Sequence, residues 1–317
     1  MQLNTLNGGK MYDVIIIGSG PAGMSAGIYS SIYKLNTLVI GEKPGGYATD
    51  AFQIKNYPGI PDVKGLDLMA KFKAHLDNLG IKSKTESVKR ITKDKKSFEV
   101  TTDKNKYQSK SIIIATGTER RKLNIPGEKE LMGKGVAFCA TCDAFFFKDK
   151  ITAVIGGSDS ALTSALQLAE YAKKVYIIFR KDTPTAIPTW IEKVKSNPKI
   201  VLVPKTNLNK IIGKEKVDQI ELDKEFNNTN VLQVDGVFIE IGTTPLVELI
   251  SHLKVELDDK DFIKVNHAQA TNIDGVFAAG DATTGSNKFQ QIITAASEGA
   301  IAANSTFKYI KSKLTEK

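Results

Sequence analysis

The chain has 317 residues and a mass of 34.6 kDa; 41% of its residues are hydrophobic and 25% are charged. This composition is typical of a soluble globular chain of about two domains, and it excludes the disordered and fibrous classes. No apolar run approaches the ~20 residues that a membrane span needs, and residues 1–10 show neither the basic nor the apolar region of a secretory signal. We therefore expect a soluble cytoplasmic protein that does not enter a membrane.

The basic charge does not resemble that of a nucleic-acid-binding protein. The formal net charge is +9, and lysines spread along the chain supply all but four of the 44 basic residues. Arginine, the residue that reads bases by paired hydrogen bonds, is nearly absent. We expect a lysine-rich solvated surface and no nucleic-acid partner, with an acidic protein partner or an anionic cofactor as the alternative. A non-catalytic nucleotide-binding or RNA-binding protein on the same fold is a separate hypothesis.

The first part of the chain predicts a βαβ unit followed by a smaller strand-rich part. Strands are indicated by short β-branched runs, and helices by amphipathic spacing or by Ala-rich composition. In chain order the predicted elements are a strand at 13–18, a helix at 19–33, a strand at 37–41, an irregular segment at 42–61, a helix at 66–79 that ends at Gly80, and three short strands within 88–114.

The opening pattern returns in the second half, where Gly156 lies 138 residues after Gly18. Alternating strands and helices predict an α/β fold with parallel sheets, built on two Rossmann-like dinucleotide-binding domains. The predicted elements are strands at 151–156 and 175–178 around a helix at 159–171, strands at 200–203, 217–222 and 234–241, a linker at 242–245, a strand at 275–279, and a long helix from about 290 to 311.

The first glycine motif follows a predicted strand directly and opens a helix. Gly18 would make the tight turn, Gly20 would let a pyrophosphate approach the backbone, and Gly23 would let the helix pack on the strand. In this βαβ setting the motif is a strong signal for a dinucleotide. Glu42, about 20 residues further on, is the candidate for binding a ribose. The candidate residues of the turn are Gly18, Ser19, Gly20, Pro21, Ala22 and Gly23.

A second cofactor signal lies near the C-terminus. The predicted strand at 275–279 ends in Gly280-Asp281, which would place a carboxylate where a ribityl hydroxyl of FAD can bond to it. The alternative is an ordinary aspartate that caps a helix. The next helix would direct its positive end at the negative charge of a reduced flavin. Its candidate residues are Gln290, Gln291 and Ile292.

The two cysteines of the chain form one motif, Cys139-Ala-Thr-Cys142, followed by Asp143. A CxxC pair suits a reversible disulfide and a thiol of depressed pKa, and the aspartate can donate and accept the proton of thiolate chemistry. Half of a zinc site and a pair of buried structural cysteines are the alternatives. We expect no metal, because a closed zinc site needs four ligands and the histidines are isolated in sequence. They are His75, His252 and His267.

In this order the motifs resemble the low-molecular-weight thioredoxin reductases, which are FAD-dependent pyridine nucleotide-disulfide oxidoreductases. The resemblance extends from Asp13 to Ile310, and the CxxC between two dinucleotide units makes it specific. Shorter stretches agree with it, namely Gly45-Gly46, 56–59, 115–117 and 291–299.

The resemblance implies an FAD-binding domain split into residues 1–118 and 243–317, with an inserted NAD(P)H-type domain at 119–242 that carries the redox pair. Two linkers would permit rotation, so that the disulfide faces first the flavin and then its partner, thioredoxin or a thioredoxin-like protein. Cys142 would interact with the flavin, Cys139 would attack the partner disulfide, and Asp143 would protonate the leaving thiolate. The family is typically homodimeric. Further implied FAD-binding positions are Gly46, Tyr47, Asn56, Val88 and Gly117.

The electron donor is the least determined part of the function. Ser158 replaces the second glycine of the motif, where a Cβ takes room and disfavours positive φ, and Thr185 stands where the family has a third cation for a 2′-phosphate. We expect weak NADPH binding, with NADH, reduced ferredoxin or a deazaflavin as alternative donors. A flavin-dependent dithiol oxidase would share the same scaffold. The candidate nucleotide residues are Gly156, Gly157, Ser158, Asp159, Ser160, Arg180 and Lys181.

Overall fold

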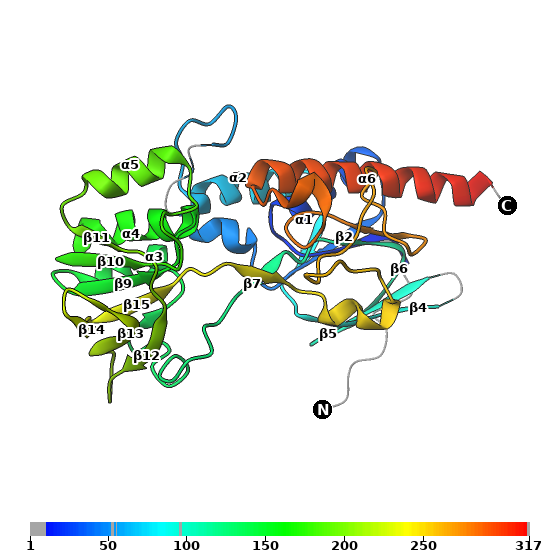
Figure 1. Cartoon of the computed structure of the whole chain (residues 1–317). Coiled ribbons are helices and arrows are strands. Elements are labelled where there is room, and N and C mark those ends of the chain that lie inside the picture. The colour runs from blue at the N-terminus through cyan, green and yellow to red at the C-terminus, as the bar shows by residue number, and fades with distance from the viewer. Residues whose placement is uncertain (1–10, 52–53, 55, 95–96, 316–317) are drawn as a thin grey trace. The chain divides into compact units, whose positions relative to one another are not determined.

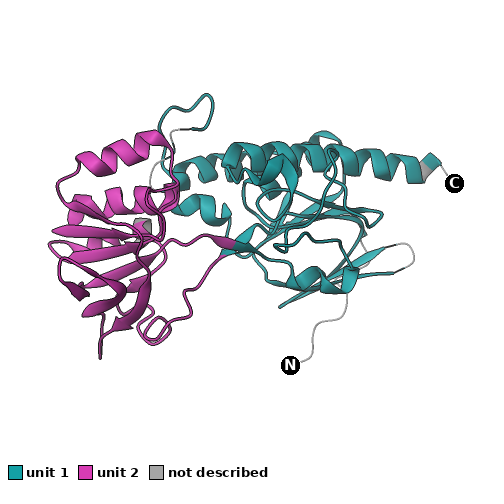
Figure 2. Ribbon diagram, viewed as in Figure 1, with its two compact units in different colours: residues 1–119, 244–317 teal, residues 120–243 magenta. Residues whose placement is uncertain are grey.

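The computed structural model describes residues 11–51, 54, 56–94 and 97–315, apart from the side chains of Thr141, Cys142 and Leu314 (Figure 1). The chain divides into two compact units (Figure 2). Unit 1 contains residues 1–119 and 244–317, and unit 2 contains residues 120–243. The boundaries expected from the sequence lie one residue earlier at each crossing.

Unit 1 is built on a mixed sheet whose central strands are parallel. Ile17, the last residue of β1, pairs with Ile40 at the end of β2 and with Ile114 at the end of β6, which in turn pairs with Ala278 of β17. Four strands therefore end level at one edge of the sheet. The strand order is β3 (Lys82–Lys84), β2 (Thr37–Ile40), β1 (Tyr12–Ile17), β6 (Lys106–Ile114), β5 (Phe98–Thr102) and β4 (Val88–Lys93), with β17 (Val276–Ala278) also on β6.

Side chains of β1 alternate between two cores. Val14 and Ile16 pack against the helices α1 and α6, whereas Ile15 and Ile17 face the opposite core. This alternation follows from the period of two of a strand that is buried on both faces. α1 and α6 lie side by side in Figure 1. The helices of unit 1 are α1 (Pro21–Ile32), α2 (Gly65–Asn78) and α6 (Ile292–Thr315), with short 3-10 turns η1 (Gly46–Asp50), η3 (Glu248–Leu253) and η4 (Gly285–Lys288).

Unit 2 has a similar plan. Its parallel sheet has helices on one face and a second, antiparallel sheet on the other. Ile155 at the end of β9 pairs with Ile178 of β10 and Ile239 of β15, and Ile178 pairs with Val203 of β11, so four strands again end level. The parallel strands are, in order, β11 (Ile200–Val203), β10 (Lys174–Ile178), β9 (Ile151–Ile155), β15 (Gly236–Ile239) and β8 (Val136–Ala137). The other elements are β12 (Leu208–Ile212), β13 (Gln219–Phe226), β14 (Thr229–Gln233), α3 (Ala140–Asp143), η2 (Ala144–Phe147), α4 (Asp159–Tyr171) and α5 (Pro188–Ser196).

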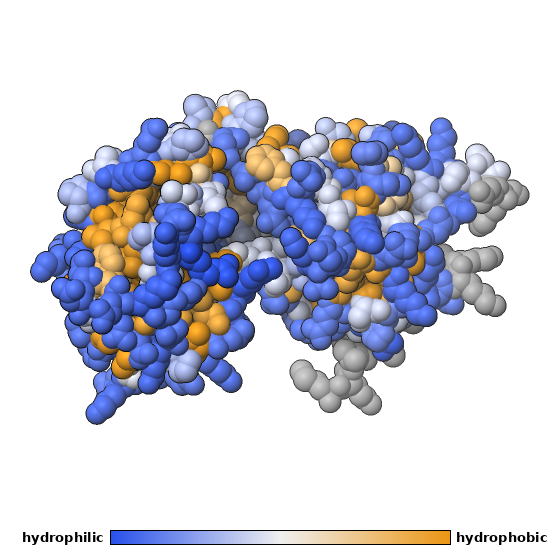
Figure 3. Space-filling view, in the orientation of Figure 1, coloured by the Kyte–Doolittle hydropathy of each residue, from blue (hydrophilic) through white to orange (hydrophobic). Residues whose placement is uncertain are grey.

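The two crossings between the units are short strands that pair with each other, β7 (Thr118–Arg120) and β16 (Thr243–Pro245). Beside them, the Arg121 N–H donates to the Gly242 carbonyl at 2.9 Å. In the part of the chain that the structure describes, no helix is both long and apolar enough to cross a membrane. Hydrophilic side chains cover most of the face in Figure 3, with apolar residues in small patches.

The α/β fold expected from the sequence is confirmed, and several elements differ in extent. β13 continues to Phe226, beyond the predicted end at 222, and β15 covers only the middle of the predicted strand at 234–241. α5, β12 and β14 were not predicted. α5 is only nine residues long, which is short for a helix to be recognised from its apolar spacing.

Candidate functional site

The glycine turn after β1 requires the absence of side chains at two positions. Gly18 has φ +116°, and a Cβ there would lie 1.9 Å from the carbonyl oxygen of Ala115. A Cβ on Gly23 would lie 1.9 Å from the carbonyl oxygen of Gly18. These two glycines therefore bring the start of α1 against the ends of β1 and β6, as the motif predicts.

Gly20 is different, because the space beside it is open. It precedes α1, and a Cβ there would have its nearest atoms, in Gly45 and Gly46, at 4.0 Å. The loop that carries these two residues is fixed by Ser19, whose carbonyl accepts the Gly45 N–H at 2.7 Å and whose Oγ donates to the Lys43 carbonyl at 3.0 Å. An open glycine cradle at the N-terminus of a twelve-residue helix fits the diphosphate of FAD.

The other predicted flavin residues of unit 1 follow the strands that end level with β1. Glu42 is exposed two residues after β2, Gly117 with φ +65° follows β6, and Gly280 with φ +81° follows β17. Ligands of open parallel sheets bind beyond this carboxyl edge. Tyr47 is exposed within η1, and Val88 begins β4, half-buried against the core.

Hydrogen bonds bring three distant segments together at the start of α6. Gln290 Nε2 donates to the Asp281 carbonyl at 3.1 Å, and Asn56 Nδ2 donates to Gln291 Oε1 at 2.7 Å. Ile292 is the first residue of α6. Burial, reinforced by the nearby charge of Glu298, raises the pKa of Asp281 to about 6. Five of the predicted flavin residues thus lie beside one helix terminus.

Glu298 was given no role in the sequence analysis, although it lies in the stretch 291–299 that resembles the family. Its side chain is buried, and its Oε2 accepts the Gly280 N–H at 2.7 Å. The available signal was a single acidic residue in an Ala-rich helix: it is the only acid between Asp281 and Glu316. Its hydrogen bond with Gly280 joins residues 18 positions apart in the chain, so the local sequence does not reveal it.

Cys139 is disulfide-bonded and half-buried, directly before α3. The only other cysteine, Cys142, lies in α3 with its side chain outside the described residues. The Asp143 N–H donates to the Cys139 carbonyl at 3.2 Å. Burial raises the pKa of the Asp143 carboxyl above its ordinary value. A carboxyl that retains its proton to higher pH, next to a disulfide, is suited to protonate a leaving thiolate.

The turn after β9 resembles the first, with one correction. Gly156 has φ +140°, and a Cβ there would lie 2.1 Å from the Glu240 carbonyl oxygen. Ser158, directly before α4, has φ −88°, so the expectation that serine is disfavoured there by a positive φ is wrong. The glycine of the motif matters at this position for room beside the backbone. The serine side chain occupies part of that room, with its Oγ 3.2 Å from Ser160 Oγ.

The segment after β10 is bonded to this second turn. The Thr185 N–H donates to the Gly157 carbonyl at 2.7 Å, and the Ile187 N–H donates to Asp159 Oδ1 at 2.8 Å. Arg180 and Lys181 are exposed just past the end of β10, the strand next to β9. They lie on the same carboxyl edge as the turn, so both cations fit a nucleotide phosphate there.

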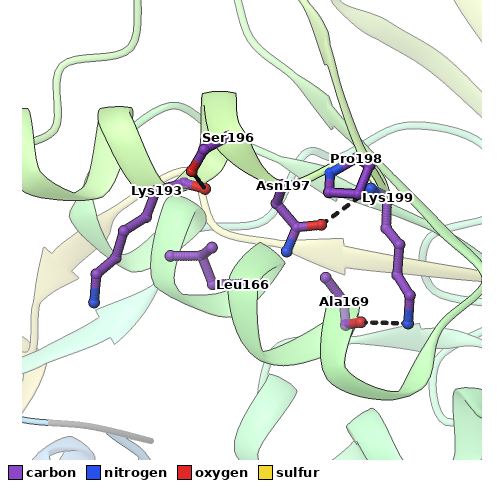
Figure 4. Close-up of a pocket in the computed structure, with 7 residues that line it drawn as sticks. All are labelled: Leu166, Ala169, Lys193, Ser196, Asn197, Pro198 and Lys199. Atoms are coloured by element: carbon purple, nitrogen blue, oxygen red, sulfur yellow. Dashed lines mark hydrogen bonds between the residues drawn. The ribbon is translucent and has the colours of Figure 1, made fainter.

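A surface depression of unit 2 lies elsewhere, between α4 and α5 (Figure 4). It measures about 520 Å³, and Lys193 and Lys199 line it. Lys199 Nζ donates to the Ala169 carbonyl at 2.8 Å, at the C-terminal end of α4 and so opposite the glycine turn. Within the described ranges no three His, Cys, Asp or Glu side chains cluster as metal ligands.

Comparisons with known proteins agree with this arrangement. A family model described as pyridine nucleotide-disulphide oxidoreductase matches residues 12–299. The thioredoxin reductase of Listeria monocytogenes is 37% identical over 305 residues, 95% of each chain. That of Treponema pallidum is 39% identical over 302 residues, 94% of this chain and 97% of its own. The crystal structure of Lactococcus lactis thioredoxin reductase matches with a TM-score of 0.90 at 35% identity, covering 95% of this chain and 99% of that one.

The chain belongs to the thioredoxin reductase family. The resemblance seen in the motifs is thereby confirmed, as are the oxidoreductase class and the pair of dinucleotide-binding folds.

Proposed function

We propose that this chain is a flavin-dependent thioredoxin-disulfide reductase. Electrons pass from a reduced donor through FAD to the Cys139–Cys142 disulfide, and from there to thioredoxin in the cytoplasm. One observation carries the proposal: a disulfide-bonded CxxC cysteine lies in the same chain as an open glycine cradle that fits FAD. Thioredoxin reductases of similar length and sequence support it.

Different residues of unit 1 bind different parts of FAD. The cradle at Gly20 and the first N–H groups of α1 take the diphosphate, Glu42 takes a ribose, and Asp281 takes the ribityl chain. The start of α6 at Ile292 stabilises negative charge on the reduced ring. Bound FAD supplies reversible two-electron transfer between the donor and the disulfide.

Cys139 and Cys142 carry out thiol–disulfide exchange once they are reduced. The Cys139 thiolate attacks a sulfur of the thioredoxin disulfide, so that a mixed disulfide forms and one thioredoxin thiolate leaves. Asp143 protonates that leaving thiolate. Cys142 then attacks Cys139 in the mixed disulfide, which restores the intramolecular disulfide and releases reduced thioredoxin. The linkers at β7 and β16 permit unit 2 to turn between the flavin and the partner.

The segment after the redox pair suits docking of an acidic protein. Phe145 and Phe146 are 68% and 67% exposed, the highest values among the large apolar side chains of the described residues. The Phe145 ring packs edge-on against Tyr171, with centroids 6.0 Å apart. Three exposed lysines lie close by in the chain or at the end of α4: Lys148, Lys150 and Lys173. Exposed aromatic rings supply contact area, and the lysines attract acidic side chains around the thioredoxin dithiol.

NADPH is the proposed donor, bound weakly in unit 2. Arg180 and Lys181 supply two cations for its 2′-phosphate, and the missing third cation at Thr185 costs about 10- to 150-fold in affinity. NADH, ferredoxin and deazaflavin stay alternatives that a flavin titration separates.

A second copy of the chain is the proposed occupant of an apolar cavity on unit 1. The cavity measures about 510 Å³ and lies between α1, α2 and α6, with Tyr29, Phe72 and Ile293 in its wall. Tyr29 and Ile293 are 41% and 38% exposed. Homodimers bury such apolar faces, and every copy of the chain carries the same one.

The function is tested with purified holoenzyme, a donor and oxidised thioredoxin. We expect reduction of thioredoxin that is abolished in Cys139→Ser, while the donor still reduces the flavin. Turnover of thioredoxin by Cys139→Ser, or by flavin-free protein, would contradict the proposal. Rapid oxygen consumption with a small dithiol, without thioredoxin activity, would instead identify a dithiol oxidase.

A further inference from the structure

The buried carboxylate of Glu298 links α6 to the loop that carries Asp281. Glu298 lies in the second turn of α6 and is 3% exposed. Its Oε2 accepts the Gly280 N–H at 2.7 Å and lies 3.2 Å from Thr283 Oγ1, whose single hydrogen is shared with the Gly280 carbonyl at 3.0 Å. Both donors flank Asp281, so one carboxylate holds the loop on either side of this residue.

The backbone packs closely around Glu298. A Cβ on Gly285 would lie 2.6 Å from Glu298 Oε1, and a Cβ on Gly280 would lie 2.9 Å from the Cβ of Ala22. A Cβ on the next residue of α6, Gly299, would lie 2.1 Å from the Ala22 carbonyl oxygen. The helix, the start of α1 and the loop thus meet backbone to backbone around this one carboxylate.

Burying a carboxylate costs free energy, and among the described residues no cation offsets that cost for Glu298. In the described part of the chain no lysine, arginine or histidine lies within ion-pair distance of Glu298. A neutral side chain of the same size would avoid most of that cost. Its negative charge also acts on Asp281, where it adds to burial in raising the pKa of that carboxyl.

We propose that Glu298 is a positioning residue of the flavin site: it fixes residues 280–283 so that Asp281 is presented at the sheet edge where the ribityl chain binds. This inference rests on the proposed function, because it assumes that FAD is the ligand. Glu298 itself does not touch the flavin; it acts through the Gly280 and Thr283 donors and through its charge.

The test compares FAD release from diluted holoenzyme, followed by flavin fluorescence between pH 5 and 8, in the wild type and in Glu298→Gln. The substitution keeps the size of the side chain and removes its charge. We expect the dissociation constant of FAD to rise about ten- to a hundredfold. We also expect the pH midpoint of FAD binding to lie lower in Glu298→Gln than in the wild type, because one charge that raises the pKa of Asp281 is gone.

Two further variants separate this role from a structural one. Asp281→Asn should abolish the midpoint, which assigns it to Asp281. Thr283→Val removes one donor and keeps the charge, so it should weaken FAD binding without moving the midpoint. Equal FAD affinity in Glu298→Gln and the wild type, or an unchanged midpoint, would overturn the inference. A wild-type protein that binds no FAD would overturn the proposed function instead.

Discussion

The surroundings of Asp143 suit its side chain to act as an acid. Burial favours the neutral form of its carboxyl, so it keeps a proton to higher pH than an exposed aspartate does. The residue follows the redox pair directly, and its N–H is bonded to the Cys139 carbonyl. A proton-bearing carboxyl therefore follows the redox pair directly in the chain.

Replacing this carboxyl tests the role. In Asp143→Asn we expect the rate of thioredoxin reduction to fall about a hundredfold, because no acid protonates the leaving thiolate. In the wild type that rate should decline as pH rises through the raised pKa of Asp143, and the variant should lack this decline. Stopped-flow reduction of the flavin by its donor is the control and should be unchanged. A variant with the wild-type rate and pH profile would exclude Asp143 as the acid.

In the first glycine turn, Gly20 and Gly23 are needed for two different reasons. Gly23 has no room for a Cβ, whereas Gly20 has room and an ordinary φ of −78°. We expect Gly23→Ala to lose about 3 kcal/mol of unfolding free energy, since backbone must move. Gly20→Ala should keep its stability and lose FAD affinity, because the added methyl group enters the space of the diphosphate.

Urea unfolding and FAD fluorescence distinguish the two glycine variants. If Gly20→Ala bound FAD as the wild type does, the cradle would not be the diphosphate site. If Gly23→Ala were as stable as the wild type, the backbone would be able to move away from the Gly18 carbonyl at little cost, which would contradict the expected loss.

The segment after β10 provides a test of the proposed NADPH site. Thr185→Arg restores the third cation, and the bond from its backbone N–H to the Gly157 carbonyl does not depend on the side chain. We expect the KM for NADPH to fall about tenfold or more and the KM for NADH to change little, because NADH has no 2′-phosphate. Steady-state kinetics with both nucleotides is the measurement, and Thr185→Gln, similar in length and uncharged, is the control. An equal gain for NADH would refute a phosphate contact.

The elements differ in how far their sequences determine them. The helix at 159–171 and the strand at 200–203 were predicted with the bounds that the structure has, because the first has a helical apolar period and the second is an unbroken apolar run. α5 is only nine residues long, which is short for a helix to be recognised from its apolar spacing. The backbone angle of Ser158 was misjudged, because a motif glycine can be selected for room instead of for φ. The contact of Glu298 with Gly280 depends on tertiary packing, which periodicity does not reveal.

On the scale of the whole molecule, the proposed homodimer has a direct test. Lysine at Tyr29 would place a charge in the apolar cavity of unit 1, where burial against a second copy would be costly. We expect the wild type to sediment as a dimer and Tyr29→Lys as a monomer. Ile187→Lys is the matched control, because Ile187 is 48% exposed but lies in unit 2. A dimer that survives in Tyr29→Lys would place the interface elsewhere.

The central claim is that one chain carries two redox centres in series, a flavin and the disulfide of Cys139. An anaerobic titration of the holoenzyme with dithionite counts them. We expect about four electrons per chain for the wild type, two for FAD and two for the disulfide, and about two for Cys139→Ser. A wild type that is fully reduced by about two electrons, at the same point as Cys139→Ser, would contradict it.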